Sequence, residues 1–152
     1  MLLTLALAAA GAPPVPLDVA LASFDRACVA PGPDVSAQRT AIAALKASVE
    51  PKQSTAPAAL ESYDAGAIGF MLIPGPQSSM CAVTAGVVID VTPAQLTNAV
   101  ATRYSIVPKL RRGTKTVQAG YWSMAGRTFN FELSDQKGLH VLLLSAYSKG
   151  YQ

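Results

Sequence analysis

The chain has 152 residues, of which 51% are hydrophobic and 14% charged, and its formal net charge is +3. A chain of this length corresponds to one domain, since domains hold roughly 100–200 residues. Its 11 glycines and two cysteines exclude collagen-like and disulfide-dense proteins, and its apolar content excludes long disorder. No uninterrupted apolar run reaches the roughly 18 residues that a membrane-spanning helix needs.

The first twelve residues have the pattern of a signal peptide. Residues 2–10 are apolar except Thr4, and Ala10-Gly11-Ala12 fits the small-x-small pattern at a cleavage site. We predict cleavage after Ala12, which leaves residues 13–152 as a single α+β domain in the periplasm or outside the cell. The alternative is a buried first helix, because no Lys or Arg precedes the apolar run.

Cys28 and Cys81 are the only cysteines, and an exported protein would meet an oxidising environment. We therefore predict a disulfide between them, worth roughly 4 kcal/mol in the chain-entropy model. The alternative is a pair of buried free thiols. Two cysteines and one histidine cannot complete the usual four-ligand zinc set, so neither a metal nor a cofactor is expected.

Two helices are predicted in the first third of the chain. Leu17, Leu21, Phe24 and Cys28 recur at helical spacing, which predicts a helix over 17–29. Asp34 is placed to cap a second helix. An apolar stripe that ends at residue 49 predicts that this helix continues to the proline at position 51.

The middle of the chain changes from helical to strand patterns. Residues 51–66 are predicted to be an irregular connector, and 67–73 and 80–89 are predicted strands. Thr92, Pro93 and Gln95 form the strongest helix start in the chain, with Thr92 as the cap and Gln95 completing a capping box. This third helix is expected to reach about Tyr104.

The residue pattern in the last third of the chain predicts a three-stranded meander, with strands over 116–124, 127–133 and 139–146. In the second of these strands, Phe129, Phe131 and Leu133 alternate with polar residues, so one face is expected to be buried and the other wet. The third strand is apolar on both faces except at His140 and Ser145, which is typical of a central strand. It is expected to pair with the strand at 67–73 or the strand at 80–89.

These elements predict an α+β fold in the order α-α-β-β-α-β-β-β. The sheet is expected to be mostly antiparallel, with about five strands and with three helices on one face. Trp122 and Met124 share one face of their strand, where they could line a ligand pocket or close the core under the helices. Tyr121 and Ser123 lie on the other face.

The sequence contains no nucleophile elbow, zinc-protease motif, phosphate-binding loop or dinucleotide fingerprint. His140 is the only histidine, and on an apolar strand it is more typical of a core or edge position than of a general base. Glu132 and Asp135 lie three residues apart, but nothing indicates the cleft that a glycosidase pair requires. No catalytic residue is assigned.

The charges are distributed unevenly along the chain. Acidic residues outnumber basic ones through residue 90, whereas eight of the ten charged residues after it are basic. A basic segment near the third helix predicts binding of an anion, such as a lipid headgroup, an anionic polymer or an acidic protein. The alternative is a solvated loop that keeps the protein soluble. The candidate ligand-binding residues are Arg103, Lys109, Arg111, Arg112 and Lys115.

The sequence thus predicts a small exported binding or interaction domain without enzymatic activity, of a kind common in bacterial cell envelopes. Its ligand is unknown, and the basic segment suggests an anionic envelope component or an acidic protein, but not nucleic acid. The alternatives are a small envelope enzyme with an unrecognised site, which would use His140 or a hydroxyl, and an inhibitor or accessory subunit that presents a protein surface.

Overall fold

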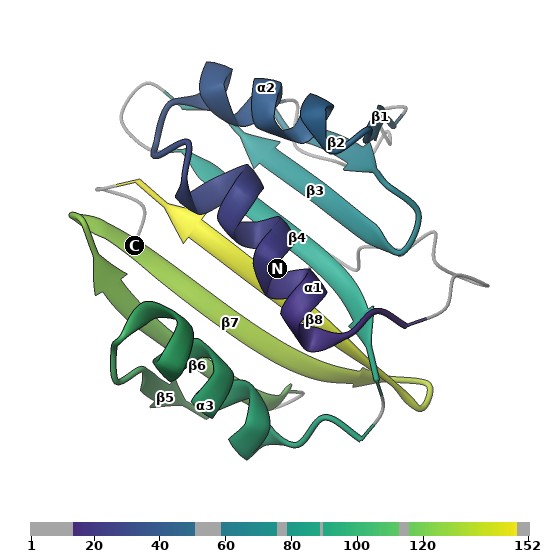
Figure 1. The fold of residues 1–152 in the computed structure, drawn as a ribbon, viewed down its shortest axis with the longest axis vertical. Helices are drawn as coiled ribbons and strands as arrows, with labels where there is room; N and C mark the ends of the chain where they lie inside the picture. The colour runs from purple at the N-terminus through teal and green to yellow at the C-terminus, as the bar shows by residue number, and fades with distance from the viewer. Residues whose placement is uncertain (1–13, 51–58, 76–78, 89, 113–115, 149–152) are drawn as a thin grey trace.

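The computed structural model describes residues 14–50, 59–75, 79–88, 90–112 and 116–148. Its strands form one antiparallel sheet of eight strands, and the helices cover one face of that sheet (Figure 1). The predicted signal peptide lies outside the described residues. None of the helices in the described part of the chain is long and apolar enough to cross a membrane.

The helices and strands follow one another in two similar series. The first series opens with the helices α1 (Leu17–Phe24), η1 (Asp25–Val29, a π-helix) and α2 (Val35–Ala44). Its strands are β1 (Ser48–Val49), β2 (Glu61–Asp64), β3 (Ile68–Ile73) and β4 (Met80–Val87). The second series consists of α3 (Pro93–Tyr104), β5 (Lys109–Arg111), β6 (Thr116–Met124), β7 (Arg127–Gln136) and β8 (Leu139–Tyr147).

The predicted sheet of about five strands is wrong, because the sheet has eight strands in the order β1-β2-β3-β4-β8-β7-β6-β5. The predicted element order is also wrong, since α3 follows four strands rather than two. The additional strands β1, β2 and β5 are two to four residues long. They carry no apolar alternation and are defined by backbone pairing with a neighbouring strand, which a local pattern does not reveal.

The second helix ends earlier than its apolar stripe predicts. Lys46 has a positive φ of 60°, a left-handed conformation that stops an α-helix. The amide groups of Leu45 and Lys46 instead bond back to the carbonyl groups of Ile42 and Ala43. Val49 consequently lies in β1, where it is 74% exposed, and not on a helix face.

Each series forms an antiparallel meander, and the two meanders join through the pairing of β4 with β8. This pairing confirms that the last strand is central, and of its two predicted partners it selects the strand over 80–89. In Figure 1, α1 lies over β4 and β8, with α2 and α3 on either side of it. The helices thus lie on one face of the sheet, over its centre and toward both of its edges.

The main core lies between the helices and the sheet. Alternate residues of each strand face the helices, and those of the central strands are almost fully buried. Trp122 stacks between Tyr104 of α3 and Phe129 of β7, with ring centroids 5.1 and 5.3 Å apart. Of the two roles considered for Trp122, the structure places it in the core.

The predicted disulfide between Cys28 and Cys81 is confirmed, and it joins η1 to β4 with a Cα–Cα distance of 5.5 Å. Arg127 lies at the same place, where its Nη1 donates to the carbonyl oxygen of Cys28 at 2.9 Å. Burial lowers the pKa of this guanidinium, which is 6% exposed. The disulfide and Arg127 together fix η1 against the sheet.

Both predicted helix caps are present. Asp34 accepts a hydrogen bond from the amide of Ser36, at 2.9 Å. Thr92 and Gln95 form the capping box, with bonds of 2.8 and 3.1 Å. These caps satisfy backbone amides that would otherwise lack partners at the helix starts.

Candidate functional site

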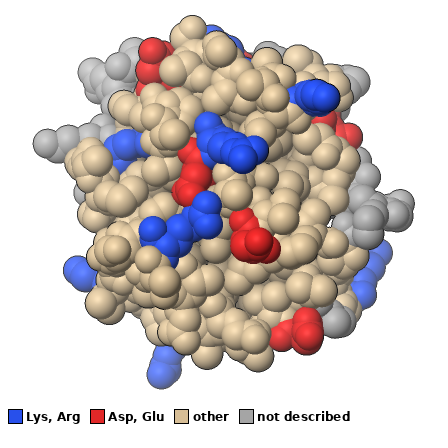
Figure 2. Space-filling view, in the orientation of Figure 1, with Lys and Arg blue, Asp and Glu red and all other residues tan. Residues whose placement is uncertain are grey.

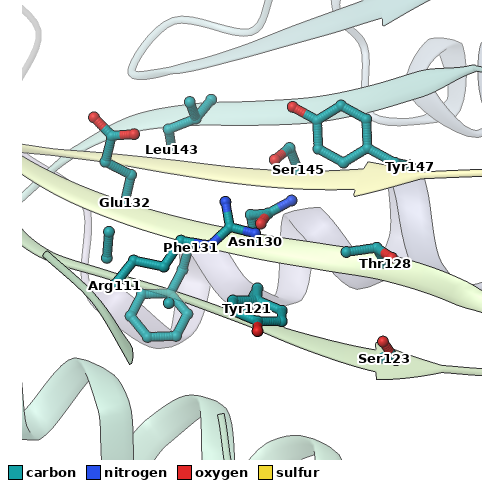
Figure 3. A pocket seen from close by; sticks show the side chains of 12 residues that line it. Arg111, Tyr121, Ser123, Thr128, Asn130, Phe131, Glu132, Leu143, Ser145 and Tyr147 are labelled. Carbon is teal, nitrogen blue, oxygen red and sulfur yellow. The ribbon is translucent and has the colours of Figure 1, made fainter. Parts of the chain in front are cut away.

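A hollow of about 610 Å³ lies on the face of the sheet that the helices leave open, and strands β5 to β8 form it (Figure 3). This volume is within the range of small-molecule sites. Charged, hydroxyl, amide and aromatic side chains line it. The lining residues are Arg111, Ala119, Gly120, Tyr121, Ser123, Thr128, Asn130, Phe131, Glu132, Leu143, Ser145 and Tyr147.

The strand register arranges most of these side chains in three rows that run across the sheet. Residues that are paired across antiparallel strands project from the same face, so each row forms a line of neighbours. The rows are Arg111–Ala119–Glu132–Leu143, Lys109–Tyr121–Asn130–Ser145 and Ser123–Thr128–Tyr147. Figure 3 shows Arg111 and Glu132 toward one end of the hollow and Tyr147 at the other.

The floor of the hollow is made of short side chains between longer ones. Ala119 lies between Arg111 and Glu132 in its row, and Ser145 is 3% exposed beside Asn130. These short residues leave space that the longer side chains border. The hollow is therefore a consequence of side-chain size along three paired rows.

Several polar groups in the hollow make no side-chain bond to any other described residue. Asn130, Thr128, Ser123 and Ser145 donate or accept no side-chain hydrogen bond within the described ranges, and Glu132 has no cation within salt-bridge distance there. Ser145 is buried, Thr128, Asn130 and Glu132 are partly exposed and Ser123 is exposed, so their donors and acceptors are accessible to a bound molecule. A group of unpaired donors and acceptors around one hollow is typical of a ligand site.

The basic end of the hollow is organised by the ring of Tyr121. The guanidinium carbon of Arg111 lies 4.3 Å from the ring centroid, and the ammonium of Lys109 lies 5.9 Å from it. A cation over an aromatic face is held by the quadrupole of the ring. Among the described residues, neither cation has a carboxylate partner.

An apolar cluster lies beside the hollow on the same open face of the sheet. Leu60, Met71 and Ala82 are at least 95% buried and form a small second cluster, against which Ile73, Met80 and Leu143 pack. Leu143 therefore marks the boundary between this cluster and the polar hollow. The hollow has one apolar side and one cationic side.

The predicted basic residues do not form one continuous surface. Arg103 belongs to α3 on the helix side and forms an ion pair with Asp25 at 2.5 Å. Lys109 and Arg111 lie on β5 and are brought together over Tyr121, while Arg112 follows them and is exposed. Lys115 lies outside the described residues. Figure 2 shows basic and acidic side chains interspersed on the helix side of the molecule.

The residues considered for catalysis are kept apart. By the alternation along β8, His140 shares the helix-covered face with Leu142 and Leu144, whereas Ser145 faces the hollow. Asp135 accepts a hydrogen bond from the amide of Gly138 in the turn between β7 and β8. Neither residue therefore supplies a general base to the hollow, since a base must lie within hydrogen-bond distance of its nucleophile.

Part of the hollow follows from the sequence and part does not. The wet face predicted for the second strand of the meander lines the hollow, and so do Tyr121 and Ser123, on the face opposite Trp122. The sequence pattern does not identify Ser145 and Tyr147 as site residues. The only signal for Ser145 was a hydroxyl in an otherwise apolar strand.

Searches with this chain found no matching protein family, no matching curated protein and no matching solved structure. Among the described residues, no three His, Cys, Asp or Glu side chains lie together as a metal site would require. The functional argument consequently depends on the geometry of the hollow.

Proposed function

We propose that this protein is an exported, non-enzymatic binding domain, and that its ligand occupies the hollow on the open face of the sheet. The observation that carries the proposal is the set of side-chain donors and acceptors there that lack partners among the described residues. The disulfide between Cys28 and Cys81 supports export, because disulfides persist in oxidising compartments.

The charges of the hollow support a ligand that carries an anionic group. Arg111 offers a planar guanidinium, which matches a carboxylate through two parallel hydrogen bonds. Lys109 adds a second positive charge over the same ring. Of the four basic candidates in the described part of the chain, Arg111 alone lines the hollow.

The proposal is tested by NMR of the ¹⁵N-labelled protein with a panel of polar probes. The panel contains amino acids, short peptides, neutral sugars, sugar acids, nucleotides and inorganic phosphate. We expect at least one probe that carries an anionic group to shift signals of residues in β5 to β8 that line the hollow. Shifts confined to other regions, or none with any probe, would contradict the proposal.

Two substitutions on the open face provide matched variants for this experiment. Ala119→Phe adds a ring at the floor of the hollow and is expected to abolish the shifts. Ser62→Phe adds a ring of the same size on β2, on the same face of the sheet but outside the hollow. It should leave binding unchanged. Equal effects of both variants would show that the shifts do not report on the hollow.

Export is tested separately by the intact mass of protein recovered from the periplasm or medium under non-reducing conditions. We expect a mature chain that begins at Pro13 and lacks two hydrogens relative to the free dithiol. A chain that retains residues 1–12 in that fraction would contradict cleavage after Ala12.

A further inference from the structure

The hollow presents two opposite charges that do not pair with each other. Arg111 and Glu132 belong to the same row of the sheet, yet their charged atoms do not form a salt bridge. The Arg111 guanidinium instead lies over Tyr121. The alanine between them in the row, Ala119, leaves the space above it open to a ligand. A ligand there would meet a cation on one side and a carboxylate on the other.

We propose that the ligand is a zwitterionic peptide of two or three residues, whose carboxylate binds Arg111 and whose terminal ammonium binds Glu132. This inference rests on the proposed function and names the ligand class of the same site. A ligand with both charges neutralises both groups, whereas a phosphate or a polyanion would place negative charge beside Glu132.

The spacing of the two backbone positions agrees with this length. Arg111 and Glu132 are separated by two strand spacings, or about 10 Å between Cα atoms. An extended chain spans at most about 3.3–3.6 Å per residue, so three residues cover that distance. Because both side chains can lean inward, two residues can also connect the charges.

The groups beside these charges suit a peptide backbone. Asn130 lies two residues from Glu132 on the same face of β7, and its amide offers both a donor and an acceptor. A peptide group needs that same combination. The hydroxyl groups of Thr128 and Ser145 flank Asn130 and supply further partners that adjust by rotation.

The experiment is a calorimetric titration at low salt with four probes that differ only at their ends. They are trialanine, N-acetyl-trialanine, trialanine amide and N-acetyl-trialanine amide. We expect trialanine to bind best, because it alone carries both charges. Each singly blocked peptide should bind at least about tenfold more weakly, because it loses one contact between opposite charges.

Two variants assign the two ends of the peptide. Arg111→Gln should lower the affinity for trialanine about tenfold and remove the preference for a free carboxylate over an amide. Glu132→Gln should instead remove the preference for a free amine over an acetyl group. Neither side chain has a bonding partner of its own in the described fold other than the Tyr121 ring, so both variants should fold.

Matched controls remove the same charges outside the hollow. Arg112→Gln removes a cation next to Arg111, and Asp90→Asn removes an exposed carboxylate after β4. Both should bind trialanine as the wild type does. If they weaken binding as much as the hollow variants do, net charge alone controls the affinity and the inference is overturned.

The remaining outcomes separate this inference from the proposed function. If N-acetyl-trialanine binds as tightly as trialanine, Glu132 does not hold an ammonium, and the ligand is a simple carboxylate. If no peptide binds while a sugar acid or another panel probe shifts the signals of the hollow, the peptide assignment is wrong but the hollow remains a binding site. Failure of every probe would reject both.

Discussion

At the scale of single residues, Asp25 connects the π-helix to the third helix. Its carboxylate accepts hydrogen bonds from the Arg103 guanidinium and the Tyr104 hydroxyl. The Tyr104 ring stacks on Trp122, so the cluster continues into the core. Burial raises the pKa of the Tyr104 hydroxyl, and the hydrogen bond to Asp25 and its charge raise that pKa further.

This raised pKa predicts a loss of stability at alkaline pH. An unfolded tyrosine ionises near pH 10, whereas Tyr104 in the fold stays protonated to higher pH. The unfolded state therefore loses its proton first, and the contribution of Tyr104 is complete below about pH 10 and falls above it. For this one group, the free energy of unfolding decreases by at most about 1.4 kcal/mol per pH unit.

Urea unfolding between pH 8 and pH 11 measures this effect. Tyr104→Phe should cost about 1 kcal/mol at neutral pH through the lost hydrogen bond, and should show a smaller decrease above pH 10 than the wild type. Arg103→Gln keeps the hydroxyl and should keep the alkaline decrease. An unchanged alkaline slope in Tyr104→Phe would refute this role.

At the scale of elements, the hairpins β6–β7 and β7–β8 use the same two-residue turn. Ala125 and Gly126 connect the first pair of strands with φ values of 52° and 73°. Lys137 and Gly138 connect the second with φ values of 53° and 82°. Two successive positive φ values define a type I′ turn, which matches the twist of the strands and favours Asn-Gly.

Ala125 thus adopts a left-handed backbone conformation that is unfavourable for a residue with a Cβ atom. An L-residue with a Cβ pays roughly 1–2 kcal/mol in the left-handed region, and Asn tolerates that region better. Ala125→Asn should therefore raise the free energy of unfolding by about 1 kcal/mol in urea denaturation. The same replacement at Ala43, an exposed position in α2, should lower it by about 0.5 kcal/mol. A loss of stability at both positions would argue against the turn strain.

The elements that the sequence predicts are those with local signals. β7 alternates apolar and polar residues from Thr128 to Leu133, and the pattern predicts its start but not its last three residues, which are polar. α3 begins with a complete capping box, and its predicted bounds agree with the observed ones. β5 consists of Lys109, Leu110 and Arg111, all exposed, and exists because it pairs with β6. The hollow depends in the same way on register, since Ser145 joins Asn130 only once β8 has paired with β7.

At the scale of the whole molecule, the fold consists of two meanders that meet at β4 and β8. The contact between β4 and β8 divides the sheet into two halves of four strands each, and α1 lies over this contact. The disulfide connects η1 to β4 at this place and closes a loop of 53 residues that includes α2 and the first three strands. It therefore links the helix layer to the sheet at the centre of the molecule.

This position predicts a large effect of reduction on global stability. Removing a native disulfide from a small exported domain typically costs about 2–5 kcal/mol, because the unfolded chain regains the freedom that the loop had removed. Urea denaturation with and without a reductant should show this decrease in the wild type. The Cys28→Ala/Cys81→Ala variant should resemble the reduced wild type and should not respond to the reductant. If reduction leaves the wild-type midpoint unchanged, the bridge does not stabilise the fold, and the contacts of α1 and Arg127 hold the helix layer to the central strands without it.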